Sequence, residues 1–118
     1  MYIYCMPIKV TLYDNTTHYV NKYIDIFNYE NIKILDISNN EQITLHKIPE
    51  TCQTLICNDN SLRELPEFPV SLIEVDCSNN NISEIKNLNN VKRLVCFDNR
   101  FPKNYFDGMK KDGIVIID

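Results

Sequence analysis

The chain has 118 residues, of which 44% are hydrophobic and 24% charged, and its formal net charge is −4 at pH 7. A chain of this length forms one domain and buries a hydrophobic core without needing disulfide bonds. A negative net charge argues against non-specific binding to nucleic acid, which requires a dense basic surface. We therefore expect an ordinary globular protein without a nucleic-acid partner.

No segment approaches the roughly 20 consecutive apolar residues that span a bilayer, so no membrane partner is expected. The first residues lack a basic region and a small-residue cleavage site, and Pro7 interrupts them, so we do not expect secretion. Five cysteines without a secretion signal favour free thiols in a reducing compartment. The expected location is intracellular, in the cytoplasm or nucleus. The abundance of Asn, Ile, Lys and Tyr and the absence of Ala suggest an A/T-rich genome, which includes viral ones, so a host cell or a virion also fits.

The first elements that the sequence predicts are two strands around a polar turn, at residues 8–13 and 17–20. Asn21 is placed to cap a short helix that follows them. The apolar residues of this helix are Tyr23, Ile24, Ile26 and Phe27. We interpret residues 1–30 as an N-terminal cap, whose apolar side chains serve packing rather than ligand binding.

From residue 31 onward the chain repeats itself. Four similar segments begin at Ile32, Cys52, Leu72 and Val91, at spacings of 20, 20 and 19 residues. In each segment, positions 1, 4 and 6 are apolar and position 9 is asparagine. These asparagines are Asn40, Asn60, Asn80 and Asn99. Apolar residues also recur at positions 11, 14 and 17, and this agreement of spacing and residue type indicates an internal repeat.

The repeat resembles the leucine-rich-repeat pattern L-x-x-L-x-L-x-x-N-x-L, at the short end of the family's range of about 20–29 residues. The Leu65-Pro66 dipeptide in this repeat resembles the short repeats of bacterial effectors and of giant-virus proteins. The resemblance implies an α/β-type solenoid, a right-handed superhelix with a parallel β-sheet on its concave face. About four repeats would fill residues 31–102, between caps at residues 1–30 and 103–118.

The asparagine at position 9 lies where the chain turns out of each strand. Its side-chain amide offers both an acceptor and donors. Stacked asparagines can therefore bond backbone groups of neighbouring coils that would otherwise be buried without partners. We predict this structural role for Asn40, Asn60, Asn80 and Asn99.

The repeat pattern fails after Phe101, as expected for a capping repeat. The tail predicts a short helix over residues 103–110 and a strand over residues 114–117. That strand is placed to extend the sheet, and if its edge is exposed it offers a natural dimer contact. A second hypothesis for the chain is therefore a structural or assembly protein, a homo-oligomer formed through strand 114–117, for example within a virus particle.

The reactive side chains form no catalytic or metal-binding motif that we recognise. Cys57, Cys77 and Cys96 share position 6 and should stack inward. Strands about 4.8 Å apart place the outer two thiols roughly 10 Å apart, too far to share a zinc ion with bonds of about 2.3 Å. We interpret them as small buried hydrophobic residues. His18 and His46 lie in different predicted elements. No enzymatic activity, cofactor or metal is expected.

The variable strand positions should point to the concave face, which repeat proteins use for recognition. The candidates for partner binding are Ile34, Asp36, Ile56, Asn58, Glu74, Asp76, Arg93, Val95 and Phe97. Among them, Ile56, Val95 and Phe97 can form an apolar patch, and Glu74 and Arg93 are neighbours that can pair. The leading hypothesis is therefore a protein–protein interaction module that binds its partner through this face.

Overall fold

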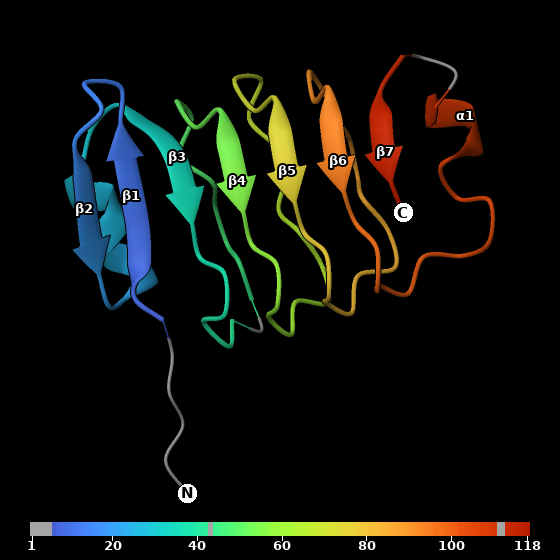
Figure 1. The fold of residues 1–118 in the computed structure, drawn as a ribbon, viewed down its shortest axis with the longest axis horizontal. Helices are drawn as coiled ribbons and strands as arrows, with labels where there is room; N and C mark the ends of the chain where they lie inside the picture. Colours follow the sequence, from blue (N-terminus) through green and yellow to red (C-terminus); the bar gives the residue numbers. More distant parts are fainter. Residues whose placement is uncertain (1–5, 43, 111–112) are drawn as a thin grey trace, which may run out of the picture.

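The computed structural model describes residues 6–42, 44–110 and 113–118 (Figure 1). Its strands form one seven-stranded sheet with the order β2-β1-β3-β4-β5-β6-β7. The elements are β1 (Ile8–Leu12), β2 (Thr17–Val20), the 3-10 helix η1 (Tyr23–Asn28), β3 (Ile32–Asp36), β4 (Thr54–Ile56), β5 (Glu74–Asp76), β6 (Arg93–Val95), α1 (Asp107–Lys110) and β7 (Val115–Ile117).

Strands β3 to β7 are parallel and in register, so each coil of the chain adds one strand beside the previous one. Leu35, Leu55, Val75, Leu94 and Ile116 form one row across these strands. After each strand the chain turns and returns behind the sheet, as Figure 1 shows. The result is a β-solenoid of about four turns, with the sheet and the return segments as its two layers.

The hydrophobic core lies between these two layers. On the strand side, repeat positions 4 and 6 supply the buried residues Leu35, Ile37, Leu55, Cys57, Val75, Cys77, Leu94 and Cys96. The return segments close the core from behind with Leu45, Ile48, Leu62, Leu65, Phe68, Ile82, Ile85 and Leu88. Full burial of a Leu, Ile or Phe side chain stabilises the fold by about 1.5–3 kcal/mol, so the periodic apolar positions hold the coils together.

The expected α/β character of the solenoid is not confirmed. Within the described residues between β3 and β6 the return segments contain turns and extended chain but no helix. Proline gives a physical reason, because it fixes φ and removes the N–H that a helix would use. Pro49, Pro66 and Pro69 lie in these segments. The helices that the structure does describe, η1 and α1, lie outside the repeats.

The two strands predicted near the N-terminus are confirmed as β1 and β2. Strand β1 pairs antiparallel with β2 on one side and with β3 on the other, so it joins the N-terminal hairpin to the solenoid sheet. Asp14 Oδ1 accepts a hydrogen bond of 2.9 Å from the backbone N–H of Thr16 in the turn of the hairpin. Asn15 has a φ of 69°, a conformation that asparagine tolerates better than most residues.

The prediction that Asn21 caps the following helix is wrong. The helix is the 3-10 helix η1, its N-cap is Lys22, and no side-chain hydrogen bond caps it. A 3-10 helix closes i→i+3 bonds, and here the Asp25 N–H donates to the Lys22 backbone oxygen at 3.0 Å. Ile26 is the one buried residue of η1, so a single anchor rather than a helical stripe fixes this element.

The C-terminal helix is shorter than predicted. Residues 103–106 form turns, and only Asp107–Lys110 are helical. Phe106 is buried, and the centroid of its ring lies 4.7 Å from that of Phe101. The hydroxyl of Tyr105 accepts a hydrogen bond of 3.1 Å from the Ile85 N–H. Aromatic packing on the preceding coil therefore fixes this segment.

The predicted C-terminal strand is confirmed as β7, and it extends the sheet parallel to β6. Residues 111 and 112, which belong to the predicted cap, lie outside the described residues. Of the helices in the described part of the chain, none has the length and apolarity to cross a bilayer.

Candidate interaction surface

One asparagine side chain per coil holds the turn after each strand. The Nδ2 of Asn60 donates to the backbone oxygen of Ile37 in the preceding coil at 2.9 Å and to that of Cys57 in its own coil at 3.1 Å. Its Oδ1 accepts from the backbone N–H of Asn40 at 2.9 Å and of Gln42 at 3.0 Å. A single side chain thus bonds the backbones of two successive coils.

The same arrangement recurs in the next two coils. Asn80 Nδ2 donates to the backbone oxygens of Cys57 and Cys77, both at 3.0 Å. Its Oδ1 accepts from the Leu62 N–H at 3.0 Å. Asn99 Nδ2 donates to the backbone oxygen of Cys77 at 2.9 Å. Because an unpaired buried backbone group costs about 1–3 kcal/mol, these side chains have a structural role.

The first coil departs from this arrangement because no solenoid strand precedes it. Asn40 Nδ2 donates instead to the backbone oxygen of Met6, just before β1. Its Oδ1 accepts a hydrogen bond of 2.8 Å from Gln42 Nε2. The side chain therefore links the first repeat to the N-terminal segment.

The residue before each of these asparagines has a left-handed backbone, a feature that sequence reasoning missed. The values of φ are 51° for Asn39, 56° for Asp59, 59° for Asn79 and 54° for Asp98. Asparagine and aspartate tolerate this region better than other non-glycine residues. The restriction of repeat position 8 to these two residue types was the signal that pointed to it.

We call the side of the sheet turned away from the return segments the outer sheet face. Repeat positions 3 and 5 project from it, because position 4 between them points into the core. In register across the strands, these positions are Ile34, Thr54, Glu74, Arg93 and Val115, and then Asp36, Ile56, Asp76, Val95 and Ile117. Seven of the nine predicted partner-binding residues are in these rows, while Asn58 and Phe97 follow their strands.

Strands β3 and β5 carry carboxylates on this face whose positions are fixed by neighbouring serines. Asp36 Oδ1 accepts from the backbone N–H and the hydroxyl of Ser38, at 3.0 and 2.6 Å. Asp76 Oδ1 accepts from the same two groups of Ser78, at 3.1 and 2.7 Å. Because these bonds use Oδ1, Oδ2 of each carboxylate can accept a hydrogen bond from a partner.

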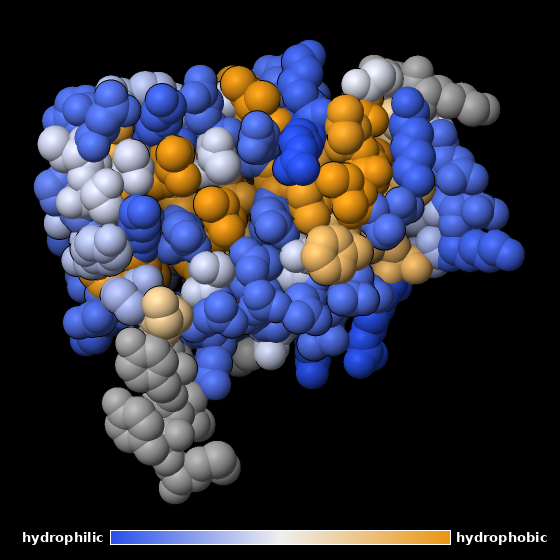
Figure 2. All heavy atoms as spheres, in the orientation of Figure 1, coloured by the Kyte–Doolittle hydropathy of each residue, from blue (hydrophilic) through white to orange (hydrophobic). Residues whose placement is uncertain are grey.

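The C-terminal part of the outer sheet face is apolar. Phe97 is 43% exposed, Val115 56% and Ile117 40%. We call these three residues the C-terminal patch. Figure 2 shows apolar side chains gathered over β6 and β7 on this face, with hydrophilic ones around them.

The predicted patch of Ile56, Val95 and Phe97 is not formed as such. Val95 is only 9% exposed, because Ile117 lies beside it in the register of β7. Ile56 is separated from Val95 by the strand that carries Asp76. The predicted strand over residues 114–117 extends the sheet as expected, but the predicted set of binding residues does not include its side chains, so the contribution of β7 to this face is missing from it.

Glu74 and Arg93 lie opposite each other on neighbouring strands, as predicted, but their side chains do not form an ion pair. The two residues are Cα partners on β5 and β6, but neither forms an ion pair with any residue that the structure describes. The one ion pair in the described part of the chain joins Lys110 Nζ to Asp118 Oδ1 at 3.0 Å. The side chains of Glu74 and Arg93 are both exposed and accessible to a partner.

The cysteines of the repeats are buried and are not in disulfides. Burial raises the pKa of the Cys52 thiol to about 12 and that of Cys96 to about 12. It also raises the pKa of Cys57 and Cys77 well above the ordinary value. These thiols are protonated at neutral pH and are weak nucleophiles. In the described residues no group of three or more His, Cys, Asp or Glu side chains is placed to hold a metal ion.

The two histidines lie in separate surroundings. The His18 ring stacks on that of Tyr29 with a centroid distance of 4.7 Å, and its Nε2 lies 3.0 Å from Thr16 Oγ1. His46 lies on a return segment and is exposed. No catalytic constellation joins them among the residues that the structure describes.

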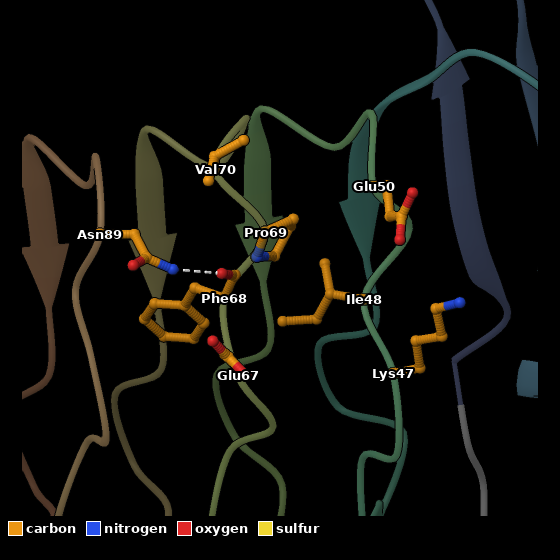
Figure 3. A pocket seen from close by; sticks show the side chains of 8 residues that line it. All are labelled: Lys47, Ile48, Glu50, Glu67, Phe68, Pro69, Val70 and Asn89. Atoms are coloured by element: carbon orange, nitrogen blue, oxygen red, sulfur yellow. Dashed lines mark hydrogen bonds between the residues drawn. The ribbon is translucent and has the colours of Figure 1, made fainter.

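A cavity of about 490 Å³ lies on the return-segment side, between successive coils (Figure 3). Ile48 and Phe68, which occupy the same repeat position in two coils, form its apolar floor. Asn89 Nδ2 donates to the Phe68 backbone oxygen at its border. Because equivalent residues of two coils line it, we interpret this cavity as the groove that forms where successive coils meet, and not as a ligand site.

Comparison with known proteins shows a partial similarity. No protein-family model matches the chain. The chain is similar to epiphycan of Gallus gallus, with 30% identity over 87 residues that cover 64% of this chain. These residues cover 27% of epiphycan, so the chain spans about a quarter of the length of that relative.

Proposed function

We propose that the chain is a leucine-rich-repeat module that binds a protein partner through the outer sheet face. The asparagine hydrogen bonds at a spacing of about 20 residues and the in-register apolar rows support the family assignment. The partial similarity to epiphycan also supports a repeat protein. Under this proposal the outer sheet face is the concave surface of a right-handed superhelix, with short repeats of the bacterial-effector or giant-virus type.

The observation that carries the proposal is the exposure of the C-terminal patch. Phe97, Val115 and Ile117 each expose 40% or more of their surface on one side of a small protein. Clustered apolar side chains rimmed by polar groups are typical of interaction sites. Phe97 is the natural anchor, since a large aromatic side chain buries much area at little cost in conformational entropy.

The charges around the patch indicate what kind of partner fits. Asp36, Glu74 and Asp76 make the neighbouring strands acidic, while Arg93 borders the patch itself. The net charge of the whole chain is −4. A partner that presents an apolar side chain to the patch, and lysines or arginines to the acidic strands away from Arg93, would complement both zones.

A pull-down with three forms of the chain tests this proposal. The baits are the wild type, Phe97→Asp, and Ile24→Asp as a matched control, because Ile24 is an apolar residue 70% exposed on η1 at the other end. We expect Ile24→Asp to capture the same partners as the wild type and Phe97→Asp to lose them. Equal capture by Phe97→Asp, with an unchanged melting temperature, would remove the proposal.

The same proposal includes no catalytic activity and an intracellular location. Buried, protonated thiols and two separated histidines support the first part. The described cysteines are all free, and this supports a reducing compartment. Fractionation of cells that express the tagged chain tests the location. Full-length tagged protein in the culture medium would contradict an intracellular location.

A further inference from the structure

Strand β7 ends the sheet and has a described neighbour on one side only. The Val115 N–H donates to the Lys92 backbone oxygen at 3.0 Å, and the Cys96 N–H donates to the Ile117 backbone oxygen at 2.8 Å. The backbone groups of Val115 and Ile117 therefore face β6. Since these groups alternate along a strand, the N–H and C=O of Ile116 face the opposite, open side.

This edge has only part of the protection that proteins give to edge strands. Strand β7 is short, at three residues, but it contains no proline and no charged side chain. Strand β7 is Val-Ile-Ile, and two of its three side chains are at least 40% exposed. The Lys110–Asp118 ion pair flanks the strand, but both side chains are more than 40% exposed, so it contributes little to holding the edge closed.

We propose that two copies of this chain associate through β7, antiparallel about a two-fold axis at Ile116. In this register the Ile116 residues of the two copies exchange N–H···O bonds as a hydrogen-bonded pair. Val115 of one copy then lies opposite Ile117 of the other, in the closer type of antiparallel pair, with both side chains on the outer sheet face. The two seven-stranded sheets become one continuous sheet.

Charge favours this orientation over a parallel one. Lys92 and Arg93 are exposed where β6 begins, and Asp98 is exposed beyond the end of β6, while Asp118 after β7 is already paired with Lys110. Antiparallel pairing brings the basic end of each copy beside the acidic end of the other, whereas parallel pairing brings like charges together. The two-fold contact is also closed, so assembly stops at two copies.

The association is independent of partner binding by the outer sheet face. Pairing takes place at the strand edge, so it places the two C-terminal patches side by side without covering them. Loss of Phe97 would then abolish partner capture and leave dimerisation intact. Ile117 also belongs to the C-terminal patch, so substitutions there are read only for dimerisation. The Phe97→Asp chain should lose capture and still dimerise, and a strictly monomeric wild type would contradict the dimer alone, so failure of either proposal is visible separately.

Sedimentation analysis of the wild type over a wide concentration range tests the dimer. We expect a monomer–dimer equilibrium that Ile117→Lys weakens by about tenfold or more, since a lysine then faces Val115 of the second copy. Ile24→Lys at the opposite end should leave the equilibrium unchanged. A strict monomer at every concentration, or open-ended assemblies, would overturn the proposal.

Disulfide trapping tests the register even if Ile117→Lys fails to fold. Val115→Cys and Ile117→Cys chains are mixed and oxidised, and peptide mapping identifies the linked residues. The close antiparallel pair, with Cα atoms about 4.5 Å apart, suits a disulfide, so the mixture should form linked dimers. Each variant alone should link at least several-fold less, because its cysteines are then diagonal neighbours roughly 7–8 Å apart. No linkage in the mixture, or equal linkage by either variant alone, would overturn the two-fold pairing about Ile116.

Discussion

Asn80 Nδ2 donates a hydrogen bond of 3.0 Å to the backbone oxygen of Cys57, 23 residues earlier and one coil back. The same nitrogen donates to the backbone oxygen of Cys77 in its own coil, also at 3.0 Å. Backbone hydrogen bonds also join successive turns, for example from the Asp59 N–H to the Ser78 oxygen at 3.1 Å, but the Leu62 N–H in the same turn bonds the Asn80 Oδ1 at 3.0 Å. The asparagine side chain therefore completes the connection between the turns with both a donor and an acceptor, so the repeat needs an amide at this position and not merely a polar residue.

Replacing Asn80 by alanine should destabilise the fold by about 3 kcal/mol. The change leaves the Leu62 N–H without its 3.0 Å acceptor, and an unpaired buried group costs roughly 1–3 kcal/mol. It also removes one of the two donors to the Cys57 oxygen, which keeps its bond from Asn60 Nδ2, and the loss of such a bond costs roughly 0.5–1.5 kcal/mol. Urea unfolding measures the loss. Asn90→Ala is the matched control, because its side chain makes one exposed bond to the Val70 backbone oxygen and should change stability by less than about 1 kcal/mol. Equal effects of the two variants would contradict the structural role of the ladder.

The left-handed backbone at repeat position 8 gives a second prediction. Asn79 has a φ of 59°, which glycine adopts freely and a β-branched residue avoids. Both Asn79→Gly and Asn79→Val lose the side-chain bond to Asp59, so their difference isolates the backbone cost. We expect the valine variant to unfold at a temperature lower by about 3–8 °C, equivalent to roughly 1–2 kcal/mol. Equal melting temperatures would show that the turn adjusts its backbone without strain.

The sequence predicted the features that depend on spacing. The repeat gave the positions of Leu35, Leu55, Val75 and Leu94 in one buried row, because apolar residues at a fixed period must face the same core. The strand at the C-terminus was predicted for a similar local reason, a run of β-branched residues after a turn.

The features that the sequence did not predict depend on contacts between distant segments. Val95 looks exposed from its repeat position, and only the register of β7, with Ile117 beside it, shows that it is buried. The helix at η1 has helical spacing of apolar residues, but only Ile26 reaches the core, and the chain forms a tighter 3-10 helix. The burial of Val95 and the helix type of η1 both depend on which segments pack together in the fold. The local sequence pattern does not contain that information.

The buried thiols predict a loss of stability at alkaline pH. Burial raises the pKa of Cys52 to about 12 from an ordinary value of 9.0. Above pH 9 the unfolded chain loses this proton while the folded chain keeps it, so the stabilising contribution is present below pH 9 and is lost as the pH rises toward 12. In Cys52→Ala the decline of the unfolding free energy over this range should be less steep, by up to about 1.4 kcal/mol per pH unit. Parallel declines in the two proteins would contradict the raised pKa.

Two phenylalanines near the C-terminal end separate stability from binding. Phe106 is 1% exposed and packs edge-to-face on Phe101 and Tyr105, whereas Phe97 is 43% exposed on the outer sheet face. Phe106→Ala should therefore cost about 3–5 kcal/mol of unfolding free energy, and amide hydrogen exchange should rise first around Phe101 and Tyr105, whose rings it contacts. Phe97→Ala should cost clearly less, about 1–2 kcal/mol, because 43% of its surface is already in contact with solvent. If Phe97→Ala destabilises the chain as much as Phe106→Ala does, Phe97 belongs to the core, and the C-terminal patch cannot be a binding surface held ready on a stable fold.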